Sequence, residues 1–135
     1  MGRRLIPFNS RKETRSKTIL VVDDEPFLTN MLSRFLQENN YITMTAENGQ
    51  EAWEKYLKSK PDLVLTGIFM PVMNGFELSQ RIKHNNASMP IIAMAGYDLP
   101  SVRMRVRKIG VEVFLGKPFH LRHVLLPCIN GLLGT

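Results

Sequence analysis

From Thr18 onward, the chain alternates between short runs of consecutive apolar residues and longer segments with apolar residues at helical spacing. The runs are typical of strands buried on both faces, and the spacing i, i+3, i+4, i+7 is typical of amphipathic helices. We expect strands at 19–22, 41–46, 63–65, 90–95 and 113–115, and helices at about 26–40, 50–60, 76–82, 102–109 and 121–132. Segment 41–46 alternates polar and apolar residues, which indicates a half-exposed strand at a sheet edge. Pro127 should kink the last helix or end it early.

Strands that alternate with helices predict a parallel sheet, because each helix carries the chain back to start the next strand in the same direction. The predicted fold class is α/β: a flavodoxin-like open three-layer sandwich with a five-stranded parallel sheet of order 2-1-3-4-5 and five helices. The length of 135 residues suits one such domain. We assign residues 18–135 to the domain and residues 1–17 to a basic N-terminal arm.

The net charge of +6 is concentrated in that arm. Residues 1–17 contain six basic residues and one acidic residue, a net +5, which leaves +1 for the rest of the chain. Such an arm can contact phosphate backbones, and a solvated tail is the simpler interpretation. The single cysteine, Cys128, excludes an internal disulfide and a zinc site of several thiolates. With no long apolar segment and no signal-peptide core, the chain is expected to be cytoplasmic.

The residues that follow the predicted strands are candidates for chemistry, since ligands bind such folds at the carboxyl ends of the strands. These residues are Asp23, Asp24, Gly67, Ala95 and Lys117. The acidic pair could hold a hard cation or pair with an amine. Alternatively, it could simply be the favourable acidic start of a helix.

Four segments of the sequence resemble the receiver domain of response regulators in two-component signalling. They are the first strand with its acidic pair at 18–26, the third strand and Met-Pro loop at 61–78, the fourth strand at 90–95, and the fifth strand with its Lys-Pro step at 110–119. The resemblance covers about residues 18 to 133 in the family's order.

The resemblance implies roles for individual positions. In the family, the third strand ends in an aspartate that accepts a phosphoryl group, and two acids after the first strand hold Mg²⁺ with it. Asp23 and Asp24 match those acids, Lys117 matches the lysine that contacts the phosphoryl group, and Phe114 matches the aromatic residue that turns inward on activation. The sequence departs from the family at two positions: Gly67 stands at the acceptor position, and Ala95 stands where a hydroxyl side chain is expected.

These departures remove the chemistry of the switch. An acyl phosphate needs a carboxylate nucleophile, and Asp62 lies about five residues, roughly 16 Å, from the acceptor position. Thr66 points to the opposite face of the sheet. We expect Lys117 to pair with Asp23 or Asp24 in preference to Mg²⁺. Metal binding by these two acids is therefore expected to be weak, and no cofactor is expected.

The resulting hypothesis is a pseudo-receiver of a phosphorelay pathway that is not an enzyme and acts by protein–protein contacts. The alternative is a phosphotransfer-competent receiver whose acceptor aspartate was replaced by Gly67 through engineering. In the family, the fourth helix belongs to the usual partner surface, and here it carries Arg103, Arg105, Arg107 and Lys108. A solvated surface is the simpler interpretation of these charges, and docking of an acidic partner or phosphate is the alternative.

The expected partner is a histidine kinase or an output domain, with the chain itself a monomer or weak homodimer. No membrane association is expected. Nucleic-acid binding is not favoured, because the sequence offers no helix-turn-helix and no aromatic stacking platform. A flavin site is not favoured either, since Asp23 and Asp24 would repel a phosphate after the first strand.

Overall fold

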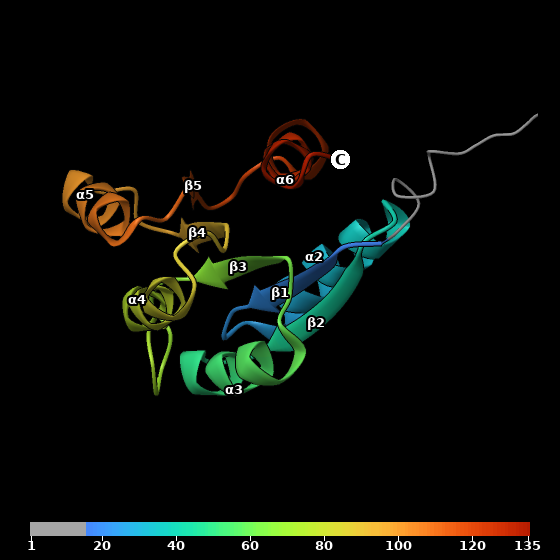
Figure 1. The fold of residues 1–135 in the computed structure, drawn as a ribbon. Helices are drawn as coiled ribbons and strands as arrows, with labels where there is room; N and C mark the ends of the chain where they lie inside the picture. Colours follow the sequence, from blue (N-terminus) through green and yellow to red (C-terminus); the bar gives the residue numbers. More distant parts are fainter. Residues whose placement is uncertain (1–15) are drawn as a thin grey trace, which may run out of the picture.

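The computed structural model describes residues 16–135, which form a parallel sheet covered by helices on both faces (Figure 1). Most of the predicted basic arm, residues 1–15, lies outside the described residues. The strands are β1 (Thr18–Val22), β2 (Ile42–Ala46), β3 (Leu63–Gly67), β4 (Ile91–Ala95) and β5 (Val113–Gly116). The helices are α2 (Pro26–Glu38), α3 (Gly49–Ser59), α4 (Gly75–Asn85), α5 (Pro100–Ile109), the π-helical turn η1 (Leu121–Leu125) and α6 (Leu126–Leu133).

The five strands are all parallel and lie in the order β2-β1-β3-β4-β5, as the sequence predicts. Alternate strand residues point to opposite faces, so the sheet has two separate apolar cores. Leu20, Val64 and Ile91 pack on the side of α3, α4 and α5. Ile19 and Leu65 pack on the side of α2 and α6. Strands β1, β3 and β4 are almost fully buried, which explains their continuous apolar runs.

Short-range signals set the ends of the helices. Asn48 and Asn74 each accept a hydrogen bond, of 2.9 Å, from the backbone N–H three residues ahead, which caps α3 and α4. Pro26 and Pro100 occupy the first turns of α2 and α5, where a missing N–H is tolerated. Gly110 ends α5 with φ 104°, a left-handed conformation that glycine adopts readily.

The structure refines two of the expected elements. Strand β2 does lie at the sheet edge, but it begins at Ile42 and does not include Tyr41. Tyr41 is buried, and its hydroxyl donates to Asn130 of α6. The last helix is not ended by Pro127. Instead, the wider π-helical turn precedes α6 and places Pro127 in the first turn of a regular helix that continues to Leu133. Within residues 16–135, no helix is both long and apolar enough to cross a bilayer.

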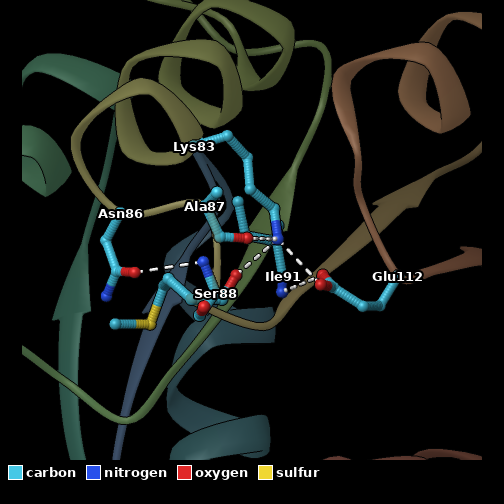
Figure 2. Close-up of polar contacts among 7 residues, drawn as sticks. Lys83, Asn86, Ala87, Ser88, Ile91 and Glu112 are labelled. Atoms are coloured by element: carbon cyan, nitrogen blue, oxygen red, sulfur yellow. Dashed lines mark hydrogen bonds and ion pairs between the residues drawn. The ribbon is translucent and has the colours of Figure 1, made fainter.

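A largely buried cation, Lys83, joins four segments at the end of the sheet where β4 and β5 begin, and its contacts are drawn in Figure 2. The Lys83 side chain on α4 is only 9% exposed, and its Nζ lies 2.7 Å from Glu112 Oε2. Lys83 Nζ also donates to the carbonyl oxygens of Ala87, at 3.2 Å, and Met89, at 2.7 Å. Glu112 accepts a further hydrogen bond from Ile91 N–H, at 2.9 Å. The pair therefore connects α4, the loop after it, β4 and the start of β5.

We predict that Lys83→Met lowers the free energy of unfolding by about 2 to 3 kcal/mol, because it leaves Glu112 and two carbonyl oxygens without their cation. Chemical denaturation followed by circular dichroism measures this loss. Arg81→Met is the matched control on the same helix: its pair with Glu77 is exposed, and its loss should stay within about 0.5 kcal/mol. Equal losses for the two variants would contradict a structural role for Lys83.

Candidate functional site

The candidate site is a cavity of about 310 Å³ where the carboxyl ends of the strands meet. Four of the five residues predicted from the strand ends line it: Asp23 and Asp24 after β1, Ala95 at the end of β4, and Lys117 after β5. Gly67, the last residue of β3, is covered by Asp23. The sheet topology thus brings together residues that are up to 94 positions apart in the chain.

The centre of the site is an ion pair between Asp23 and Lys117. Asp23 is 1% exposed, and its Oδ2 lies 2.8 Å from Lys117 Nζ. The other carboxylate oxygen, Oδ1, accepts the backbone N–H of Glu25 at 3.0 Å. Lys117 Nζ also lies 3.7 Å from Glu25 Oε1. The expected pairing of the lysine is therefore present, and it involves Asp23 rather than Asp24.

Gly67 leaves room that the Asp23 carboxylate fills. A Cβ atom built on Gly67 would lie 2.5 Å from Asp23 Oδ2 and 3.3 Å from Asp23 Cγ. Both distances are shorter than an ordinary van der Waals contact. With its observed rotamer, Asp23 therefore occupies the space that any side chain at position 67 would need.

Asp24 differs from Asp23 in its surroundings. Its side chain is exposed at the mouth of the cavity, and among residues 16–135 it has no ion-pair partner within 4 Å. Partial burial and the neighbouring charge of Asp23 raise the pKa of Asp24 above its ordinary value. Its negative charge is thus disfavoured in the folded state.

Aromatic residues at the mouth of the cavity were not anticipated from the sequence. Phe69 and Tyr97 are exposed and meet edge to face, with ring centroids 6.3 Å apart. Phe69 also contacts Phe76 on α4, at 6.1 Å between centroids. Only their positions in the sequence could have predicted this: each residue lies two positions beyond the end of a central strand, where ligands bind such folds.

The loop from β3 to α4 is fixed by two glycines. Gly75 N–H donates to Ile68 O at 2.7 Å, and a Cβ on Gly75 would lie 2.7 Å from Ile68 Cα. Gly49 N–H donates to Met73 O at 2.9 Å. Backbones approach this closely only where a glycine has no side chain to interfere. The loop is therefore held in one shape beside the cavity.

Phe114, the predicted switch aromatic, is partly buried and packs against the core on the side of α3, α4 and α5. The Arg103 guanidinium lies over its ring, 4.9 Å from the centroid. Arg103 in turn pairs with Asp98, with one hydrogen bond of 2.9 Å, and this pair lowers the pKa of Asp98. Arg103 thus covers the ring from the solvent side.

The four basic residues predicted as one face of α5 are divided between two edges of the helix. Arg103 is directed toward Phe114 of β5, and Arg107 lies one turn further along the same edge. Arg105 lies over the ring of Phe76 on α4, 3.9 Å from the centroid. Lys108 follows Arg105 on that second edge. The basic residues expected to form a single face therefore lie on two edges of α5, with Arg103 and Arg107 on one edge and Arg105 and Lys108 on the other.

The acidic pair offers few unpartnered oxygen atoms to a divalent metal. Both oxygens of Asp23 already have protein partners, and Gly67 supplies no ligand. Within the described part of the chain, no three His, Cys, Asp or Glu side chains are grouped to hold an ion. Mg²⁺ requires near-octahedral oxygen ligands, and an ion at this place would compete with Lys117 for the charge of Asp23.

A family model described as response regulator receiver domain matches residues 19–127. The chain belongs to the response regulator receiver family. Receivers of this family are signalling modules of two-component pathways that interact with histidine kinases and output domains. The assignment agrees with the strand order and with the position of the cavity.

Individual relatives support the assignment. The chemotaxis protein CheY of Halobacterium salinarum is 36% identical over 110 residues, which cover 82% of this chain and 92% of that protein. The response regulator GtcR of Aneurinibacillus migulanus is 35% identical over 106 residues, and the chain spans only 43% of its length. The solved structure of Vibrio cholerae chemotaxis protein CheY4 superposes with a TM-score of 0.82 at 28% identity, covering 87% of this receiver and 99% of that chain.

We predict that Lys117→Met lowers the free energy of unfolding by about 2 to 4 kcal/mol, because it leaves a buried carboxylate without its cation. The double variant Asp23→Asn/Lys117→Met should recover much of this loss, since it removes both charges together. Denaturation of the two single variants and the double variant gives the coupling free energy of the pair. Strictly additive losses would show that the ion pair does not stabilise this receiver.

Proposed function

We propose that this receiver is a pseudo-receiver: it takes no phosphoryl group at an aspartate and acts through protein contacts in one fixed conformation. The observation that carries the proposal is the position of the Asp23 carboxylate, within 2.5 Å of where a side chain at Gly67 would begin. Lys117 already has a negative partner there, at 2.8 Å. The charge that a phosphoryl group would supply to the lysine in other receivers is supplied here by Asp23.

Among residues 16–135, no neighbouring group is placed to replace the missing nucleophile. Asp62 Oδ2 accepts the backbone N–H of Thr18 at 2.7 Å, at the opposite end of β1. The Thr66 side chain is fully buried, and its hydroxyl donates to the carbonyl oxygen of Gly67 at 2.8 Å. Ala95 has no hydroxyl to bind a phosphoryl oxygen. Acyl phosphate formation needs a free carboxylate; Asp23 is paired with Lys117, and the unpaired Asp24 follows β1 at the mouth of the cavity and not the end of β3.

We also propose that this receiver acts without a bound metal ion. A Mg²⁺ ion would compete with Lys117 for Asp23, and the Coulomb attraction of a pair about 4 Å apart is on the order of 4 kcal/mol at an effective dielectric near 20, before desolvation costs. The partners would be those of the family, a histidine kinase or an output domain. Contact with them would not depend on the phosphorylation state of this chain.

The direct test is incubation of the full chain with acetyl phosphate and Mg²⁺, followed by intact mass spectrometry. We expect no gain of mass, while a phosphorylatable receiver treated in parallel gains one phosphoryl group. A gain of one phosphoryl mass on this chain, stable at low temperature and lost with hydroxylamine, would overturn the proposal. Hydroxylamine cleaves acyl phosphates and leaves phosphate esters of serine or threonine intact.

A second test restores the acceptor. We predict that Gly67→Asp lowers the free energy of unfolding by about 1 to 3 kcal/mol in the absence of Mg²⁺. The new Cβ displaces the Asp23 carboxylate, and the new carboxylate adds a like charge beside it. Millimolar Mg²⁺ should reduce this loss, since a third carboxylate then completes an oxygen ligand set. Thermal unfolding with and without Mg²⁺ measures both effects.

Gly96→Asp is the matched control, because Gly96 lines the same cavity and a Cβ built there meets no atom within 4 Å. This variant should change stability by less than about 0.5 kcal/mol. If Gly67→Asp were as stable as Gly96→Asp without Mg²⁺, Asp23 would not be occupying the acceptor position.

A further inference from the structure

A second hollow lies away from the carboxyl ends of the strands, between helices α4 and α5. These two helices are neighbours on one side of the sheet (Figure 1). This groove has a volume of about 610 Å³. Its polar lining consists of Gln80, Lys83 and His84 from α4 together with Arg105 and Lys108 from α5. No acidic side chain is among its lining residues in the described part of the chain. The groove therefore has a positive charge that the nearly neutral domain as a whole does not have.

The cations of this α4–α5 groove differ in whether they have partners. Lys83 is bound by Glu112 and two carbonyl oxygens, so its charge is already compensated (Figure 2). Arg105 and Lys108 are exposed and form no ion pair with any residue of 16–135. Arg105 and Lys108 are therefore the groups left to bind an anion.

Arg105 is oriented before any ligand arrives. Its guanidinium carbon lies 3.9 Å from the centroid of the Phe76 ring, and Phe76 is itself 5% exposed. Stacking on a fixed ring restricts the arginine but leaves its in-plane N–H donors free. Those donors match the two oxygens of a carboxylate, and little side-chain entropy remains to be lost on binding.

We propose that the α4–α5 groove docks an acidic peptide segment of a partner protein, with Arg105 and Lys108 binding its carboxylates. The size of the groove favours a peptide over a single small anion, because one carboxylate or phosphate would fill only part of 610 Å³. The apolar lining residues Ala87 and Ile109 would contact side chains between the acidic ones. The proposal deepens the proposed function, since it places one partner contact of a receiver that acts without phosphorylation.

The test is fluorescence anisotropy of a fluorescein-labelled octapeptide with four glutamates, titrated with the full chain without phosphodonor. We expect saturable binding, weakened by about tenfold or more in the double variant Arg105→Gln/Lys108→Gln, because two charge-assisted contacts are lost. The matched control is Arg34→Gln/Lys58→Gln, which removes one arginine charge and one lysine charge from exposed positions on α2 and α3. The affinity of this control variant for the peptide should stay within about twofold of that of the unsubstituted chain.

Three results would overturn the groove proposal: no saturable binding, equal weakening in both double variants, or binding only of a single-stranded DNA octamer used in place of the peptide. Circular dichroism of each variant confirms that it is folded. The outcome is separable from that of the phosphodonor experiment. A phosphoryl gain would overturn the pseudo-receiver proposal whether or not the peptide binds, and absence of peptide binding would leave the mass result unchanged.

Discussion

The buried ion pair between Asp23 and Lys117 is the interaction on which the functional end of this receiver depends. It links the ends of β1 and β5, which are separated in the sheet by β3 and β4. A carboxylate that is 1% exposed must have a compensating partner, because desolvation of an isolated charge costs several kcal/mol. The pair is possible in this geometry only because position 67 between the two strands has no side chain. The glycine at position 67 and the paired lysine are thus two aspects of one arrangement.

The architecture was largely predictable from the sequence, for physical reasons. Buried parallel strands appear as continuous apolar runs, and Ile19–Val22 and Ile91–Ala95 are such runs. Strand ends converge, so the positions of Asp23 and Lys117 predicted their meeting. The sequence alone does not show whether Lys117 pairs with Asp23 or with Asp24, because that depends on which carboxylate lies beside Gly67 at the end of β3. Only the three-dimensional structure shows that Asp23 does.

Other features required the packed structure because they depend on contacts distant in the sequence. Lys83 belongs to a helix with several surface charges, and nothing local distinguishes it from Arg81. Its burial follows from the position of Glu112, 29 residues away. In the same way, Arg103 and Arg105 look alike in the sequence, but one stacks on Phe114 of the sheet and the other on Phe76 of the neighbouring helix. Helical spacing alone indicates that they diverge, and only the packing shows what each one contacts.

The presence of Asp23 and Lys117 in a receiver is usually read as a sign of phosphotransfer, and this structure gives each residue a different reason to be there. Replacing Lys117 leaves the buried Asp23 without its cation, and replacing Asp23 leaves Lys117 with only the more distant, exposed Glu25, so the cost is greatest for the unpaired Asp23. Gly67 and Ala95 are under no such constraint, since a position that carries no charge leaves none unpaired. An acidic pair and a lysine can therefore remain for structural reasons after the acceptor and the hydroxyl are absent. The presence of these charged residues is thus weak support for phosphotransfer, and the residue at the end of β3 is the more informative position.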